Sequence, residues 1–231
     1  MNSEKENILR RVREALTVPA PHPGHHEAEG QELEGYSPGI SHWLPPVHAG
    51  FNAQAELFSR NSAQLRTTFH LLENEAAALA TLSELARAEG WERVAAHGDG
   101  ARGPATRAMV TALALPVTWT DTGYDVREME RCDAGITECD ALVAQTGSVL
   151  VTSRSAGGRA LSVLPPHHVV LARRDQLLAD LPAAFELIER AYGGAYPSFI
   201  GFITGPSRTG DIERILVLGA HGPKKLTILC W

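Results

Sequence analysis

From residue 51 onward the sequence alternates between amphipathic helical segments and short apolar runs, and this alternation limits the possible folds more than any other feature. The helical patterns cover residues 53–66, 74–89, 104–114 and 176–191. The apolar runs predict strands at residues 67–71, 93–97, 117–120, 141–144, 148–152, 168–172, 199–203, 214–218 and 225–230. Strands separated by helices of about 10 to 15 residues are typical of right-handed βαβ units and a parallel sheet.

The second half of this pattern differs from the first. The apolar runs 141–144 and 148–152 flank a tight turn, which is typical of an antiparallel hairpin. The last three runs are separated by turn-rich loops instead of long helices. The sequence therefore predicts one α/β domain over residues 51–231 with a mixed sheet.

Residues 1–50 have a different texture. Ser3 and Glu6 stand at capping-box spacing and open an amphipathic helix over residues 3–16. The segment 17–50 holds six of the 14 prolines and five of the ten histidines, without apolar periodicity. We expect an extended arm whose helix docks on the main domain or on a partner. The histidines at 22–26 lie among prolines, which favours a solvated arm, and no metal site is predicted there.

Charge and hydropathy exclude several classes of partner. The 231 residues include 21 Lys and Arg against 27 Asp and Glu, a net charge of −6. This is the wrong sign for counterion-driven binding to nucleic acid and for attraction to anionic lipid. No apolar stretch approaches the roughly 20 residues that span a bilayer, and the N-terminus shows no secretory apolar region. We expect a cytoplasmic protein.

The three cysteines are Cys132, Cys139 and Cys230. They form no C-x-x-C pair and none of the close spacings that hold an iron–sulfur cluster. Asp140 adjoins Cys139, and Cys230 lies in an apolar run, so neither thiol is predicted to be activated. We therefore predict structural thiols and no cofactor in this chain.

A polar segment between two apolar runs is the first candidate site. It consists of Gly205, Pro206, Ser207, Arg208, Thr209, Gly210, Asp211, Ile212 and Glu213. Two hydroxyls, successive backbone amides and the guanidinium of Arg208 suit a carboxylate or phosphate. Asp211 and Glu213 are candidates for orienting Arg208 or for proton transfer. A capped turn with local hydrogen bonds is the alternative.

Two further turns join this candidate. Gly219–Pro223 carries His221, a candidate proton carrier near neutral pH, although a hydrogen-bonded turn histidine fits equally well. The predicted hairpin turn contributes an amide and two hydroxyls at strand ends, from Gln145, Thr146, Gly147 and Ser148.

A glycine-rich segment gives an alternative cofactor site. Gly98, Gly100 and Gly103 form a G-x-G-x-x-G pattern after a predicted strand and before a predicted helix, and Asp121 follows 18 residues after Gly103. This is the context of a dinucleotide fingerprint, in which the acid receives a ribose hydroxyl. Pro104 departs from the usual first helical turn, and a glycine-rich surface turn is the other interpretation.

Four segments together resemble the LUD-domain proteins of the lactate-utilisation C type. They are residues 135–148, 161–168, 205–213 and 219–223. The resemblance covers about residues 51–231 and is strongest after residue 130. It implies a three-layer α/β fold similar to the sugar-phosphate isomerase and CoA-transferase superfamily. The matching positions are Thr146, Gly147, Gly205, Pro206, Ser207, Arg208, Thr209, Asp211, Glu213, His221, Gly222 and Pro223.

The resemblance also implies a function. It points to oxidation of L-lactate to pyruvate together with an iron–sulfur subunit and a cysteine-rich subunit, which would carry the cofactors. Gly210 stands where Ala is common, and Gln145 stands where members commonly have Glu. Loss of that carboxylate removes a candidate acid or base. We therefore expect this chain to bind a small acid without turning it over. Two alternatives stay open. One is a stand-alone isomerase, transferase or cyclo-ligase acting on a phosphorylated, CoA or folate substrate, and the other is an NAD-binding protein.

Overall fold

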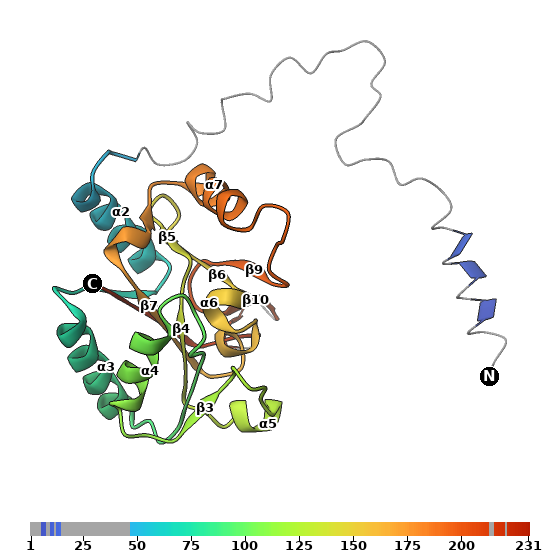
Figure 1. Ribbon diagram of the computed structural model, residues 1–231, viewed down its shortest axis with the longest axis horizontal. Coiled ribbons are helices and arrows are strands. Elements are labelled where there is room, and N and C mark those ends of the chain that lie inside the picture. The colour runs from blue at the N-terminus through green and yellow to red at the C-terminus, as the bar shows by residue number, and fades with distance from the viewer. Residues whose placement is uncertain (1–5, 8–9, 12, 15–46, 213–214, 220) are drawn as a thin grey trace, which may run out of the picture. The chain divides into compact units, whose positions relative to one another are not determined.

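The computed structural model describes residues 6–7, 10–11, 13–14, 47–212, 215–219 and 221–231 (Figure 1). The chain divides into two units, residues 1–43 and residues 44–231. The predicted N-terminal helix and the proline-rich arm fall largely outside the described residues.

A six-stranded sheet forms the centre of the domain, with the strand order β1-β12-β7-β4-β2-β3. Every neighbouring pair in it is parallel. Its strands are β1 (Thr68–Leu71), β2 (Val94–Ala96), β3 (Val117–Trp119), β4 (Ala134–Glu138), β7 (His167–Ala172) and β12 (Lys225–Cys230). The parallel sheet agrees with the βαβ pattern of the sequence.

Two smaller sheets carry the antiparallel pairs. The order β8-β5-β6-β9 forms a four-stranded sheet, in which β5 pairs β8 in parallel and β6 antiparallel. Its strands are β5 (Ala141–Val143), β6 (Ser148–Thr152), β8 (Leu177–Leu178) and β9 (Ile200–Ile203). A separate ribbon pairs β10 (Arg208–Ile212) with β11 (Ile215–Leu218). The prediction of one mixed sheet is therefore corrected: the six-stranded sheet is all parallel, and the four-stranded sheet is the mixed one.

Helices and the second sheet cover the two faces of the central sheet (Figure 1). One face packs against α3 (Glu75–Glu89) and α4 (Gly103–Thr111). The other packs against α2 (Phe51–Gln64) and the four-stranded sheet, whose outer side packs against α7 (Leu181–Tyr192). The short helices are α5 (Val126–Met129), α6 (Ser153–Ala156), η2 (Ala160–Ser162) and η3 (Arg174–Gln176).

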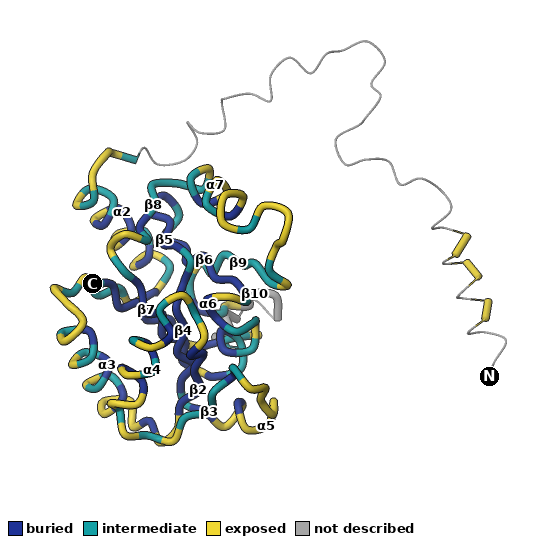
Figure 2. The backbone as a smooth tube through the Cα atoms, in the orientation of Figure 1, coloured by how far each residue is buried: buried dark blue, intermediate teal, exposed yellow. Residues whose placement is uncertain are grey.

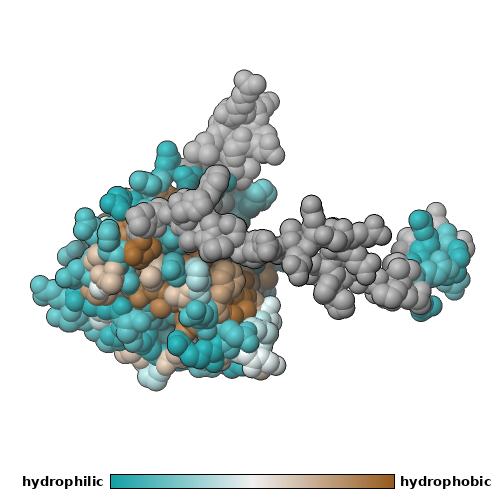
Figure 3. Space-filling model, turned by 90° about the horizontal axis from the view of Figure 1, so that it is seen from above, coloured by the Kyte–Doolittle hydropathy of each residue, from teal (hydrophilic) through white to brown (hydrophobic). Residues whose placement is uncertain are grey.

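Burial follows these layers. Figure 2 shows that the central strands are buried, whereas the helices expose their outer sides. Seen from above in Figure 3, hydrophilic side chains form most of the visible rim of the domain. None of the described helices is long and apolar enough to cross a membrane.

The structure departs from the predicted elements at β4. No strand is predicted over Ala134–Glu138, because glycine and glutamate lower β-propensity there. The structure shows why a glycine is needed. A Cβ at Gly135 would lie 2.3 Å from the carbonyl oxygen of Leu161, so the strand admits no side chain at that point.

The three cysteines are buried, as the sequence predicts for structural thiols. Burial raises the pKa of the Cys230 thiol to about 11 and that of Cys139 well above its usual range. Desolvation also raises the pKa of Cys132. All three therefore stay protonated near neutral pH.

Two adjacent histidines in β7 are buried on opposite faces of the central sheet, since successive residues of a strand alternate. His167 Nε2 lies 2.8 Å from Thr227 Oγ1, and His168 Nε2 lies 2.9 Å from Thr137 Oγ1. The Nδ1 atom of each ring is buried and has no partner among the described residues. Desolvation lowers the pKa of His168 from 6.5 to about 3, and that of His167 to about 4.

We predict that these histidines make the fold sensitive to acid. Because their pKa values are lower in the folded state, the unfolded chain binds more protons below about pH 6.5, and stability falls as the pH drops toward 4. Each buried ring accounts for on the order of 3 kcal/mol of this loss at pH 4. Urea unfolding at pH 7 and pH 4 measures it.

His168→Gln keeps a polar group near Thr137 without the titration. It should lose less unfolding free energy between pH 7 and pH 4 than the wild type, by about 3 kcal/mol. His221→Gln, at an exposed position, is the control and should match the wild type. Equal pH dependence in His168→Gln and the wild type would contradict the prediction.

Candidate functional site

The hairpin turn after β5 packs on the end of α2. Asn61 Nδ2 donates to the carbonyl oxygens of Ala144 and Gln145, each at 2.9 Å. Gly147 has φ 66°, and a Cβ there would lie 2.8 Å from the Ser62 amide nitrogen, so this turn requires glycine. The turn that the sequence analysis singled out is thus held against α2.

The polar segment after β9 lies beside this turn. Ser148 Oγ and Thr204 Oγ1 are 2.8 Å apart, joining residues distant in the sequence. Gly205 has φ 92°, and a Cβ there would lie 2.9 Å from the carbonyl oxygen of Leu65 and 3.5 Å from Arg208 Nη2. The φ angle and the Leu65 carbonyl therefore require glycine here, and the Arg208 guanidinium lies close by.

The third segment closes the group. The Ser207 amide donates to the carbonyl oxygen of Pro223 at 2.9 Å, and the Gly219 amide donates to the Ser207 carbonyl at 3.0 Å. A Cβ at Gly222 would lie 3.2 Å from Ser207 Cβ. We call residues 145–148, 204–208, 219 and 221–223 the motif cluster. The Lys224 amide bonds to Pro166 just before β7, so the cluster lies toward the amino-terminal edge of the central sheet.

The structure corrects one detail of the predicted anion site. Residues 208–212 form a strand paired with β11 instead of an open loop, and the Ser207 amide is already bonded to Pro223. Successive amides are therefore not all open to an anion. The Thr146 hydroxyl is buried and has no hydrogen-bond partner among the described residues.

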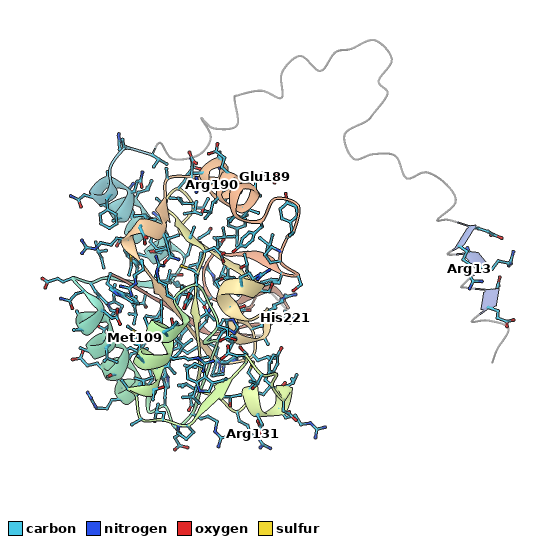
Figure 4. All side chains as sticks on the ribbon, in the orientation of Figure 1. Arg13, Met109, Arg131, Glu189, Arg190 and His221 are labelled. Carbon is cyan, nitrogen blue, oxygen red and sulfur yellow. The ribbon has the colours of Figure 1, made fainter. Side chains whose placement is uncertain are left out.

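The other predicted site residues are either outside the described part of the chain or exposed. Glu213 lies outside the described residues, as do the side chains of Thr209 and Asp211. His221 is exposed at the surface of the domain (Figure 4), and Arg208 is exposed as well. Their catalytic roles stay predictions.

The glycine-rich segment does lie next to Asp121. The amides of Gly98 and Asp99 donate to Asp121 Oδ1 at 2.8 and 3.1 Å, and Arg107 pairs with the other carboxylate oxygen. The side chain of Asp121 is only 3% exposed. The carboxylate of Asp121, which the sequence suggested for binding a ribose hydroxyl, is therefore bound by the chain's own amides and by Arg107. The dinucleotide site stays a prediction.

A cleft opens at the carboxyl ends of β2 and β4. The chain leaves β2 for the edge strand β3 and returns to β4 on the other side of β2, so the direction of winding reverses here. Open α/β sheets bind ligands outside the carboxyl ends of strands at such a switch point. We call this the switch-point cleft. Its volume is about 360 Å³, and its lining residues include Arg102, Glu138, Asp140, Arg154 and Tyr192.

Two carboxylates line this cleft. Glu138 is 5% exposed and accepts hydrogen bonds from the Arg102 amide at 3.0 Å and from Thr106 Oγ1 at 2.6 Å. A Cβ at Gly100 would lie 2.7 Å from Glu138 Oε2, so the glycine loop passes directly over this carboxylate.

Asp140 is bound by three hydroxyls. Ser155 Oγ donates to its Oδ2 at 2.5 Å, while Thr152 Oγ1 at 3.3 Å and the Tyr192 hydroxyl donate to Oδ1. Desolvation first, and then the hydrogen bond to Asp140, raise the pKa of Tyr192. The phenol therefore stays protonated at neutral pH.

The sequence analysis missed Glu138, Asp140, Arg154 and Tyr192 as site residues. Recognising β4 as a strand would have placed Glu138 and Asp140 at its carboxyl end, beside the end of β2 that precedes the glycine loop. Arg154 and Tyr192 lie on other elements, α6 and α7, and carry no local signal. Among the described residues, no three His, Cys, Asp or Glu side chains are grouped closely enough to hold a metal ion.

Comparison with known proteins places the chain in a family. A family model described as the LUD domain matches residues 55–230. Lactate utilization protein C from Shouchella clausii is 38% identical over 106 residues, 46% of this chain and 46% of that protein. The protein of the same name from Deinococcus radiodurans is 32% identical over 139 residues, 56% of this chain and 64% of its own length.

A third relative of that name, from Bacillus subtilis, is 34% identical over 103 residues, 44% of this chain and 43% of that protein. The chain thus spans about half the length of the curated relatives it matches. A crystal structure of a DUF162 family protein from Deinococcus radiodurans matches with a TM-score of 0.61 at 19% identity, covering 79% of this chain and 99% of that one. That likeness concerns the fold alone.

The family model spans the domain that holds both the motif cluster and the switch-point cleft. It confirms the resemblance that the four sequence segments indicated, and the chain belongs to the LUD-domain family.

Proposed function

We propose that this chain is a subunit serving the oxidation of L-lactate to pyruvate, and that it works with iron–sulfur and cysteine-rich partner subunits in the cytoplasm. The name lactate utilization protein C, shared by several relatives at 32–38% identity, supports this role. The buried cysteines, whose thiol pKa values are raised, make poor metal ligands. This favours redox centres on the partner chains.

We further propose that the motif cluster binds a small carboxylate or phosphate anion. One observation carries this proposal: three segments distant in the sequence meet through the Ser148–Thr204 and Ser207–Pro223 hydrogen bonds. Arg208 supplies a planar fork of donors suited to a carboxylate. The Thr146 hydroxyl, in the same cluster, is buried without a hydrogen-bond partner among the described residues.

The residues at this cluster suit binding better than turnover. Gln145 replaces the carboxylate that would serve as an acid or base, and His221 is exposed. In this proposal the cluster holds the anion, and the electrons removed from lactate pass to the partner subunits. The alternative is a stand-alone enzyme on a fold like the sugar-phosphate isomerase and CoA-transferase superfamily, which the parallel sheet supports only as an analogy.

We predict that the tagged full chain, purified from the native host grown on L-lactate, co-elutes with iron–sulfur and cysteine-rich subunits in stoichiometric amounts. Iron analysis and identification of the co-eluting chains provide the measurement. A solitary, iron-free chain that turns over a phosphorylated, CoA or folate substrate by itself would support the stand-alone enzyme instead.

We also predict that Arg208→Ala weakens binding of L-lactate or pyruvate to the purified chain by about tenfold or more, because a charge-assisted hydrogen bond is lost. Isothermal titration calorimetry measures the dissociation constant. Arg190→Ala, at an exposed position on α7 (Figure 4), is the matched control and should bind like the wild type. Unchanged affinity in Arg208→Ala would reject the anion site.

A further inference from the structure

The switch-point cleft is separate from the motif cluster. The cluster lies toward the amino-terminal edge of the central parallel sheet, and the cleft lies at the carboxyl ends of β2 and β4. We propose that this cleft binds a phosphorylated pentose, either free or as part of a nucleotide. The proposal goes beyond lactate utilisation and does not depend on it.

The size of the cleft sets the first limit. The hollow of about 360 Å³ shares Ala101, Arg154 and Tyr192 as lining residues with a second hollow of about 490 Å³. Sites for small organic ligands usually have volumes of about 300–1,000 Å³. A three-carbon acid would leave most of this space to water, whereas a phosphorylated sugar fills a large part of it.

One side of the cleft suits an anionic group. Arg154 is exposed at the start of α6, lines both hollows, and forms no ion pair with another described residue. Gly100 and Ala101 line the neighbouring hollow, and the amide of neither residue donates to a described acceptor. An arginine that shares a hollow with backbone amides lacking a protein acceptor is a typical environment for a phosphate group.

The helix that follows the glycine loop adds to this side. The nine-residue helix α4 begins at Gly103, just after the open amides, and its dipole favours negative charge there. Its own leading amide, on Arg102, is already bonded to Glu138. Binding of an added anion therefore falls to Gly100, Ala101 and Arg154.

The other side of the cleft suits neutral hydroxyl groups. The carboxylates of Glu138 and Asp140 repel an anion, but each has lone pairs beyond those used by its protein donors. The Tyr192 hydroxyl donates to Asp140 and interacts with Thr152, which leaves one lone pair of its oxygen for a ligand. A ligand that bears hydroxyls next to its phosphate satisfies both sides at once.

This arrangement also replaces the role that the sequence suggested for Asp121. That carboxylate is almost fully buried and holds the glycine loop in place. The acids available to sugar hydroxyls are Glu138 and Asp140, at the end of β4. Gly100 permits this, because any side chain there would collide with the Glu138 carboxylate.

Calorimetric titration of the purified full chain tests the proposal with ribose 5-phosphate, AMP, ribose, inorganic phosphate and L-lactate. We expect ribose 5-phosphate or AMP to bind more tightly than ribose or inorganic phosphate alone. The tighter of the two shows whether the pentose is free or part of a nucleotide. Failure of both to bind at millimolar concentration would overturn the proposal.

Two variants assign the two sides of the cleft. Arg154→Ala should raise the dissociation constant of the phosphorylated ligand by roughly 10- to 100-fold. Tyr192→Phe should weaken ribose 5-phosphate but not inorganic phosphate, and its thermal midpoint shows whether loss of the Asp140 hydrogen bond disturbs the fold. Arg190→Ala, two residues before Tyr192 on α7, is the control and should bind normally. Equal losses in Arg154→Ala and Arg190→Ala would overturn the assignment.

A cross-test separates this proposal from the anion site of the motif cluster. Arg208→Ala should leave ribose 5-phosphate binding unchanged, and Arg154→Ala should leave L-lactate binding unchanged. Lactate binding that depends on Arg154 would overturn the phosphate-ester assignment. Lactate binding lost only in Arg208→Ala leaves both assignments in place.

Discussion

The central parallel sheet must be covered on both faces, and the rest of the domain follows from that requirement. Parallel strands carry apolar side chains on both sides, and exposure of either face to water would greatly destabilise the folded state. Here α3 and α4 cover one face. The other face is covered by α2 and by a second sheet, which then needs α7 over its own outer side. This extra layer brings Tyr192, at the end of α7, to the carboxyl end of β4.

The same layering produces two polar regions at different edges of the sheet. The hairpin of β5 and β6 turns back on the end of α2, which carries Gln145–Ser148 to the motif cluster. The start of that hairpin stays next to β4, which leaves Asp140 in the cleft. One supersecondary unit therefore contributes to both regions, although each region has its own charged groups.

The sequence predicted the elements whose signal is local. The helices α2, α3 and α4 lie within a few residues of the predicted ranges, because their apolar periodicity coincides with burial on one face. The sequence did not reveal β4, where Gly135 is dictated by the approach of Leu161 and Glu138 by contacts with Arg102 and Thr106. Those causes are tertiary, so no local pattern carries them. The motif segments could be named from sequence, but their meeting depends on the fold.

The glycine-rich segment shows why a motif does not by itself define a ligand site. Its glycines are required by the chain itself, since a Cβ at Gly103 would lie 2.1 Å from the Gly98 carbonyl oxygen and one at Gly100 would strike Glu138. Asp121 accepts hydrogen bonds from the amides of Gly98 and Asp99, and Glu138 accepts one from the amide of Arg102. Three amides of the loop are therefore already hydrogen-bonded within the protein. Only the two amides between them remain for a ligand. Because Arg154 lines the cleft beside those two amides, the anion-binding capacity of this loop depends on a residue some 50 positions later in the sequence.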